Sequence, residues 1–301
     1  MVWGTVEPGT SLDCLSGIGR RLKLVEAEIT CSKSVAAAVR RSKPERIFHL
    51  AAQSHVPTSW ADPVSTLRVN VEGTLNLLMA AVGSGKTKAS RKLPRVLLVS
   101  SGDVYGTTAG LKGRIKESTP LSPLNPYAAS KVSAEMMATC IQAGRKLPVI
   151  IVRPFNHIGP GQSPVFVISD FARQLARIEA GLTKPVMKVG DLSARKDFTD
   201  VRDMIRAYIT AVERCPPGKP FNICSGKSLS IKKSLDMLMK VSGVQARVVT
   251  EKKRLRVTSS SAARIDSSAF RRATGWKPEI PLRKTLADIL DYWRNRVRDE
   301  K

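Results

Sequence analysis

The chain has 301 residues, a net charge of +25 and 42% hydrophobic residues, which is enough for one large or two modest domains. No stretch approaches the roughly 18 apolar residues of a transmembrane helix, and the first residues, MVWGTVEPGTS, lack the apolar core of a secretory signal. The five cysteines form no Cys-x-x-Cys pair, so we expect no disulfides, no zinc site and a reduced cytoplasmic location.

The excess positive charge is scattered along the chain. Basic clusters stand at 83–95, 251–256 and 294–298, while aromatic residues make up only 5% of the sequence. Binding of single-stranded nucleic acid needs stacking rings beside the basic groups. We therefore expect an anionic small substrate, and neither nucleic acid nor a membrane as a partner.

Apolar runs alternate with helical patterns through the first half of the chain. In chain order they predict a helix at 32–43, a strand at 45–53, a helix at 70–82, a strand at 94–101, a helix from 125 onward and a strand at 148–155. Continuous apolar strands between helices are typical of a parallel sheet covered on both faces. The pattern then loosens, with helices at 166–181 and 230–243, and indicates a smaller second lobe.

Residues 125–131, Asn-Pro-Tyr-Ala-Ala-Ser-Lys, combine a helix start with two reactive side chains. Asparagine caps a helix N-terminus and proline suits its first position, so Tyr127 and Lys131 fall one turn apart on one face. Ser101 ends the preceding apolar strand, where α/β sheets bind their ligands. Taken alone, the Tyr-x-x-x-Lys spacing also fits an ordinary amphipathic helix with a solvated lysine.

A serine, a tyrosine and a lysine together suit the reduction of a carbonyl group. The carbonyl needs a proton donor as hydride arrives, and a tyrosine, whose ordinary pKa is about 10, can be that donor. A nearby lysine charge is expected to lower the pKa of the phenol towards neutrality. A serine hydroxyl can hold the carbonyl oxygen in line.

The motifs together resemble the extended short-chain dehydrogenases/reductases that act on nucleotide sugars (the NAD-dependent epimerase/dehydratase family). The resemblance runs from about residue 1 to residue 295 and depends on HLAAQSHV (49–56), NVEGTLNLL (70–78), SSGDVYG (100–106), PYAASK (126–131), RPFNHIGPGQ (153–162), DFTDVRD (197–203), FNICSG (221–226) and TGWKP (274–278). Within this family the set is most similar to the reductases of GDP-4-dehydro-6-deoxy-mannose, and the GDP-mannose 4,6-dehydratases share much of it.

The resemblance implies a Rossmann-type doubly wound parallel sheet with a smaller C-terminal α/β lobe. Residues 1–155 would bind NADP(H) or NAD(H), and residues 156–301 would mainly bind the nucleotide sugar. The implied reaction is reduction of the 4-keto group of a GDP-linked 4-keto-6-deoxy-hexose to GDP-rhamnose. The resemblance leaves open whether the chain forms a homodimer.

The resemblance also implies a role for individual residues. Tyr127 would be the general acid, Lys131 would bind the nicotinamide ribose and tune the tyrosine, and Ser101 would hold the 4-keto oxygen. Cofactor contacts are implied, besides those of Tyr127 and Lys131, for Leu50, Ala51, Ala52, Asn70, Ser100 and Pro154. Substrate contacts are implied for Gln53, Ser54, Asp103, Asn156, Arg195, Lys196 and Arg256. The three histidines are expected to be structural, and no metal site is implied.

The sequence departs from the family pattern in three places. No strand followed by Gly-x-x-Gly-x-x-Gly, the loop that holds the dinucleotide pyrophosphate, is present; CLSGIGRRL (14–22) is the nearest match. MVWGT resembles the family's second strand, so we expect a truncated reading frame that lacks the first strand. Lys196 stands where the family usually has arginine, with Arg195 one residue earlier, and LRVTSS (255–260) lacks the usual acidic residue.

Three functions stay open. The first is the reductase, the second a nucleotide-sugar dehydratase or epimerase, and the third a truncated homologue that only binds. Elimination of water needs an extra acid/base pair beside the serine, and those two positions hold Gly102 and Asp103. Because glycine has no acid or base to offer, the sequence favours the reductase. A protein that only binds would have no need of Ser101, Tyr127 and Lys131 together.

Overall fold

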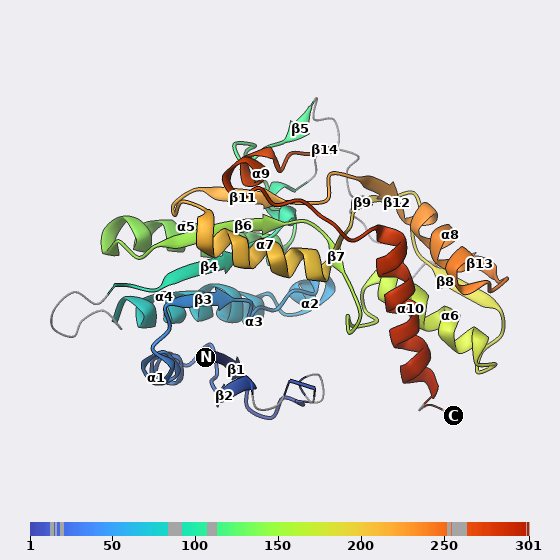
Figure 1. The fold of residues 1–301 in the computed structure, drawn as a ribbon, viewed down its shortest axis with the longest axis horizontal. Coiled ribbons are helices and arrows are strands. Elements are labelled where there is room, and N and C mark those ends of the chain that lie inside the picture. Colours follow the sequence, from blue (N-terminus) through green and yellow to red (C-terminus); the bar gives the residue numbers. More distant parts are fainter. Residues whose placement is uncertain are drawn as a thin grey trace. The chain divides into compact units, whose positions relative to one another are not determined.

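The computed structural model describes the whole chain except residues 13, 14, 16, 19, 20, 84–91, 107–112, 252, 253, 255–263, 299 and 301. The chain packs as two compact units, drawn in Figure 1. Unit 1 comprises Met1–Gly106, Pro120–Arg153 and Tyr208–Phe221, and unit 2 comprises Thr107–Thr119, Pro154–Ala207 and Asn222–Lys301. The chain therefore changes unit close to the predicted boundary at 155 and also at four other points. The assignment of cofactor and substrate to separate parts of the chain stays a prediction.

A sheet of four strands forms the centre of unit 1 among the described residues. Its order is β11 (Pro220–Ile223), β6 (Val149–Pro154), β4 (Arg95–Val99) and β3 (Arg46–His49). β4 runs parallel to both β3 and β6. The side chains of β4 and β6 are almost completely buried, as expected for strands covered on both faces. The predicted strand at 45–53 is shorter in the structure, because β3 ends at His49.

Two further strands of unit 1 pair with each other and not with this sheet. β1 (Val2–Val6) runs parallel to β2 (Leu22–Glu26). No described strand pairs with both β1 and β3. The predicted doubly wound sheet is therefore present in two pieces within the described residues. Parallel strands alternating with helices confirm the predicted α/β class.

The helices of unit 1 begin and end where local chemistry dictates. α1 (Ser32–Ser42) stops at Lys43, which takes a left-handed conformation with φ 45° just before Pro44. α5 (Pro126–Arg145) starts after Asn125, whose side-chain oxygen accepts the Ala128 N–H at 2.8 Å. Both helices confirm the sequence patterns.

The predicted helix at 70–82 has a more complex form. α4 (Gly73–Gly83) is preceded by η3 (Arg68–Glu72), a π-helical turn, and by the short helices α2 (Val56–Ala61) and α3 (Pro63–Leu67). Gly73 is needed at this junction, because a Cβ atom there would lie 2.8 Å from the Ile29 side chain. Helical periodicity alone does not distinguish such a π turn from an α-helix.

Three helices build the core of unit 2: α6 (Val167–Glu179), α8 (Ile231–Ser242) and α10 (Leu282–Arg298). Around them lie α7 (Val201–Arg214), which continues into unit 1, and α9 (Ser268–Thr274). The strands of this unit pair in twos: β7 (His157–Ile158) with β10 (Thr199–Asp200), β8 (Val186–Val189) with β13 (Arg247–Thr250), β9 (Arg195–Asp197) with β12 (Ser228–Ser230), and β5 (Arg114–Ile115) with β14 (Arg264–Ile265).

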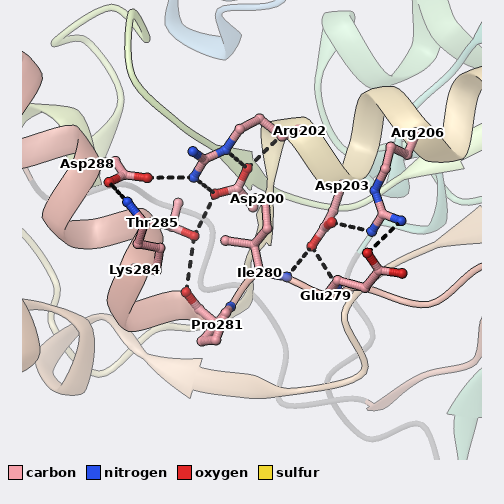
Figure 2. A network of polar contacts seen from close by, with 10 residues as sticks. All are labelled: Asp200, Arg202, Asp203, Arg206, Glu279, Ile280, Pro281, Lys284, Thr285 and Asp288. Atoms are coloured by element: carbon pink, nitrogen blue, oxygen red, sulfur yellow. Dashed lines mark hydrogen bonds and ion pairs between the residues drawn. The ribbon is translucent and has the colours of Figure 1, made fainter.

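Polar contacts fasten the start of α7 to the segment that leads into α10 (Figure 2). The buried carboxylate of Asp200 accepts a hydrogen bond from the Thr285 hydroxyl at 2.7 Å. Arg202 bridges Asp200 and Asp288, at 2.7 Å from each carboxylate. These contacts join the DFTDVRD motif to the C-terminal helix within unit 2. Among the described helices, none is both long and apolar enough to span a membrane.

Candidate active site

The structure brings Ser101, Tyr127 and Lys131 together inside unit 1. Ser101 lies two residues after Val99, the last residue of β4, and the other two side chains come from the first turns of α5. All three residues are at most 9% exposed. Tyr127 is hydrogen-bonded to Ser101, and the Lys131 ammonium lies 6.0 Å from the centre of the tyrosine ring. The parallel strand end and the capped helix start thus place a hydroxyl, a phenol and a cation within one small volume.

Lys131 is anchored to the sheet by a main-chain contact. Its Nζ donates to the carbonyl oxygen of Val99, the last residue of β4, at 3.0 Å. Burial lowers the pKa of Lys131 to about 8, and the negative charge of Glu135 opposes this shift. At neutral pH the side chain is therefore still mainly an ammonium ion.

The expected depression of the Tyr127 pKa is wrong for this structure. Burial raises the pKa of the phenol to about 12; the hydrogen bond from Ser101 opposes that shift, and the negative charge of Asp103 adds to it. The Lys131 ammonium is turned to the Val99 carbonyl, so it does little to offset the burial. A phenol with this pKa is protonated at neutral pH and can donate a proton.

The Ser101 hydroxyl makes two hydrogen bonds, one as an acceptor and one as a donor. Its hydroxyl oxygen accepts the main-chain N–H of Asp103 at 3.1 Å, which begins the 3-10 turn η4 (Gly102–Tyr105). The hydroxyl proton is therefore directed to another acceptor, and Tyr127 is the partner in the structure. A hydrogen bond from Ser101 also stabilises a phenolate, which is what remains after Tyr127 has given up its proton.

Asn70 ties the segment after β3 to α5. Its Oδ1 accepts the Gln53 N–H at 2.8 Å, and its Nδ2 donates to the Gln53 carbonyl and to the Ser130 hydroxyl oxygen, each at 2.9 Å. Ser130 in turn donates to the carbonyl of Tyr127 at 2.7 Å. Asn70 is 1% exposed and lies in the π turn η3, a kind of turn that is frequent at functional sites.

Apolar side chains follow directly on β3. Leu50 is 61% exposed, Ala51 is exposed and Ala52 is half-buried. They come just before Gln53, which Asn70 holds, so they form a fixed apolar surface at the carboxyl end of a parallel strand. His49, beneath them, is 6% exposed; burial and the Lys131 charge lower its pKa to about 3, so it is neutral.

A buried charge network beside the site was not predicted from the sequence. The Ser100 hydroxyl donates to Glu135 Oε1 at 2.5 Å, and Arg153 Nη2 lies 2.6 Å from Glu135 Oε2. Arg153 also donates to the Tyr105 hydroxyl at 2.8 Å. The available signal was a glutamate four residues after Lys131, which places both charges on the same face of α5. The Ser100 hydroxyl, predicted to contact the cofactor, therefore points to Glu135.

The other predicted substrate contacts are surface groups. Ser54 and Asp103 of unit 1 are exposed, as are Asn156 and Arg195 of unit 2. Arg195 donates to the Ser228 carbonyl at 2.7 Å. Pro154 is buried at the end of β6, and Lys196 is half-buried in β9. Arg256 lies outside the described residues. The predicted cofactor contact of Pro154 and the predicted substrate contacts of the other residues stay predictions.

The segment 14–22, the nearest match to the pyrophosphate-binding loop, does not lie between a strand and a helix as that motif requires. Gly17 lies in a turn between β1 and β2, so its loop joins two strands and not a strand to a helix. Gly19 of the same segment lies outside the described residues. In the part of the chain that the structure describes, no three His, Cys, Asp or Glu side chains are grouped so as to hold a metal ion.

Comparisons with known proteins place the chain in a family. Residues 11–289 match the family model described as GDP-mannose 4,6 dehydratase. The chain is 39% identical to GDP-6-deoxy-D-mannose reductase of Pseudomonas aeruginosa over 85% of this chain and 83% of that protein. It is 30% identical to UDP-glucose 4-epimerase of Mycolicibacterium smegmatis over 92% of this chain and 84% of that protein.

A solved structure gives the same answer. The structure of RMD from Pseudomonas aeruginosa complexed with NADPH superposes with a TM-score of 0.84 at 35% identity and covers 91% of each chain. The resemblance inferred from the motifs is confirmed. The chain belongs to the GDP-mannose 4,6-dehydratase family of extended short-chain dehydrogenases/reductases.

Proposed function

We propose that this protein is an oxidoreductase that reduces the 4-keto group of a GDP-linked 4-keto-6-deoxy-hexose to give GDP-rhamnose. The observation that carries the proposal is the buried group of Ser101, Tyr127 and Lys131, in a chain 39% identical to GDP-6-deoxy-D-mannose reductase. A carbonyl reduction needs a proton donor, a group that holds the oxygen and a nearby positive charge, and these three residues supply them.

The cofactor of this reaction is NADP(H) or NAD(H), which supplies the hydride when bound. The residues present fit its nicotinamide and ribose half. Leu50, Ala51 and Ala52 offer an exposed apolar surface for the ring, and Lys131 is the cation that would bind the ribose. The solved relative complexed with NADPH supports this choice of cofactor.

The residues of the chain carry the proton and the charge. Tyr127 is protonated at neutral pH and gives its phenolic proton to the oxygen of the keto group. The Ser101 hydroxyl holds that oxygen and then hydrogen-bonds to the phenolate. The Lys131 ammonium stabilises the negative charge left on Tyr127. Desolvation favours the neutral phenol, so these two stabilising contacts decide how readily the proton leaves.

A 4,6-dehydratase is the second candidate, because the matching family model carries that description. Dehydration requires a base for the proton at C5 and an acid for the oxygen at C6. The positions after Ser101 hold Gly102, which has no side chain, and Asp103, which is exposed. A single carboxylate cannot readily fill both roles, so the site supports reduction better.

Product analysis separates the two candidates. The protein is incubated with GDP-4-keto-6-deoxy-mannose and NADPH or NADH, and separately with GDP-mannose, and the sugars are identified by NMR. We expect a reduced 6-deoxy sugar from the first substrate and no elimination from the second. Comparable dehydration of GDP-mannose without net consumption of the cofactor would overturn the reductase in favour of the dehydratase.

The role of Tyr127 has its own test. Tyr127→Phe should lower kcat by about a hundredfold or more and leave binding of the nucleotide sugar nearly unchanged, because only the proton donor is lost. Tyr292→Phe is the matched control, since Tyr292 is a half-buried tyrosine of unit 2 outside the site. Equal loss in both variants would contradict the assignment.

A cytoplasmic homodimer completes the proposal. Cys31, Cys140, Cys215 and Cys224 are free thiols, which suits a reducing compartment. Apolar side chains of α2, α3 and α5 are exposed on unit 1, namely Trp60, Val64, Leu67 and Met136. Exposed apolar side chains of this kind are typical of protein–protein interfaces, and we assign them to the contact with a second copy of the chain. Sedimentation of the wild type and of Val64→Asp tests this, and a monomeric wild type would refute it.

A further inference from the structure

Glu135 and Arg153 form an ion pair that the reaction described above does not use. The side chains are 2% and 4% exposed, and their charged atoms approach to 2.6 Å. A buried ion pair is a weak source of stability, because a well-packed apolar pair of similar volume is often as stable. Stability alone therefore does not explain why this pair is buried here. Its place beside Ser100 and Lys131 suggests a role in the site.

The first contact of Glu135 leads to Ser101. Glu135 Oε1 accepts the Ser100 hydroxyl at 2.5 Å, and the Ser100 N–H donates to the Val152 carbonyl of β6 at 2.9 Å. Ser100 is thus held by its side chain and by its main chain. Ser101 is the next residue, in an extended conformation with φ −156° and ψ 149°. The orientation of the Ser101 hydroxyl therefore depends on the carboxylate of Glu135.

The second effect of Glu135 is on Lys131, one helical turn earlier on α5. Burial favours the neutral amine, and the charge of Glu135 is what favours the ammonium. The other ionisable groups around Lys131 give no such support. His49 from β3 is neutral, and Tyr127 is protonated at neutral pH.

Three further ionisable groups lie near the site, one of them Tyr208 of α7, whose pKa is raised by burial and by Tyr127, so it is neutral at neutral pH. Arg153 from β6 is a cation bound to Glu135, and it donates to Tyr105 from η4. Asp103, also from η4, is exposed to solvent and acts on Tyr127. Arg153 holds the Glu135 carboxylate in place from the side of β6.

We propose that Glu135 is a positioning residue of this site: it fixes Ser101 through Ser100, and it keeps Lys131 in its charged form. The inference rests on the proposed reduction and adds a residue to it. The charge of Glu135 and its hydrogen bond to Ser100 can be tested separately, because their losses have different effects. Loss of the charge should change the pH dependence, whereas loss of the hydrogen bond to Ser100 should change only the rate.

The charge is tested with Glu135→Gln. Lys131 then loses its proton at lower pH, so the alkaline fall of kcat/KM should move down by about one pH unit, which is about a fivefold loss at pH 8. Since the variant leaves the buried Arg153 without the negative charge of Glu135 and can fail to fold, Glu135→Gln with Arg153→Met is made as well. Glu213→Gln, which breaks the exposed pair with Arg46, is the control.

The hydrogen bond is tested with Ser100→Ala, which keeps the charge of Glu135. We expect kcat to fall about tenfold with no displacement of the pH profile. An unchanged profile in the folded Glu135 variants, or a Ser100→Ala variant with the kcat of the wild type, would overturn the proposal.

A measurement without substrate separates this inference from the proposed function. The ¹³Cε resonance of Lys131 is assigned by its loss in Lys131→Met and is followed against pH. It should titrate at a lower pH in the folded Glu135 variants than in the wild type, and an equal titration refutes the inference. A wild type that reduces no keto-sugar refutes the proposed function and leaves this titration valid.

Discussion

Each unit of the molecule has a network in which carboxylates are paired with arginines, and the two networks are built differently. The first, the Glu135 network, belongs to unit 1 and comprises Ser100, Tyr105, Glu135 and Arg153. The second, the α7 network, belongs to unit 2 and comprises Asp200, Arg202, Asp203, Arg206, Glu279, Ile280, Pro281, Lys284, Thr285 and Asp288 (Figure 2).

The α7 network binds main chain. Asp203 Oδ2 accepts the N–H groups of Glu279 and Ile280, each at 2.9 Å, and Oδ1 accepts from Arg206 at 2.5 Å. The side chains of Arg202 and Arg206 are 44% and 42% exposed, so their charges stay hydrated. This network fastens the segment after α9 to the start of α7.

The Glu135 network consists of side chains alone, and its cation and anion are both buried. It leads to Ser100 and, along α5, to Lys131. A buried carboxylate bound to main chain thus holds two segments together, whereas one bound only to side chains can set the charge and orientation of reactive groups. Removal of an arginine of the α7 network should also lower the free energy of unfolding by less than removal of Arg153.

The largest expected effect is that of Arg153→Met. It leaves the Glu135 carboxylate buried without its cation, which should lower the free energy of unfolding by about 3 to 5 kcal/mol. Urea unfolding at pH 7, compared with Arg46→Met at the exposed Arg46–Glu213 pair, checks it. A cost equal to that of the surface control would remove the distinction between the two networks.

Asp203→Ala should cost less, about 2 to 3 kcal/mol, because it leaves the N–H groups of Glu279 and Ile280 without an acceptor while Arg206 remains hydrated. The same urea unfolding measures it. We also expect the pH profile of kcat/KM to stay as in the wild type, since this carboxylate belongs to unit 2 and not to the unit that contains Lys131. A displaced profile would break the division of roles.

Lys131 should make stability depend on pH in a definite direction. Its folded pKa of about 8 is below its ordinary value of 10.5, so between these values the unfolded chain binds more protons and the free energy of unfolding rises with pH. The rise should be about 2 kcal/mol between pH 8 and 10, at 1.36 kcal/mol per pKa unit. The raised pKa values of Cys215 and Cys224 act in the opposite direction above pH 9, and that of Tyr127 does so above pH 10, so the rise is measured as the difference from a variant without Lys131.

This pH dependence is measured by urea unfolding at pH 7.5 to 10 in the wild type and in Lys131→Met. The variant should lack the rise. A variant with the same rise as the wild type would show that another group is responsible. Below pH 6.5 His49, with its pKa of about 3, lowers stability in the wild type as pH falls, because the unfolded chain gains a proton that the folded chain excludes. This decline should be smaller in Lys131→Met, because the Lys131 charge is one of the two causes of the low His49 pKa.

The smallest expected effect is that of Arg202→Met. Asp200 keeps the Thr285 hydroxyl and the N–H of residue 202 as donors, and the lost cation is 44% exposed. We expect a loss of at most about 1 kcal/mol of unfolding free energy. Differential scanning calorimetry of Arg202→Met and Arg153→Met compares the loss of stability in the two variants. A loss as large as that of Arg153→Met would mean that exposure does not separate the networks.

The features that depend on a few neighbouring residues could be predicted from the sequence. The Asn-Pro pair placed the start of α5, and helical spacing put Tyr127 and Lys131 on one face. Apolar runs located β4 and β6, and the combination of motifs identified the family. Caps, turns and periodicity act within about four residues, so they can be read along the chain.

Contacts between residues far apart in the chain could not be predicted from the sequence, because they depend on how the elements pack. Glu135 and Arg153 are joined because α5 packs on the sheet that contains β6, and the Asn70–Gln53 contact needs the π turn of η3. The pKa of Tyr127 was predicted in the wrong direction for the same reason. Spacing showed that a lysine was near, but burial depends on everything packed around the phenol, and it outweighed the lysine.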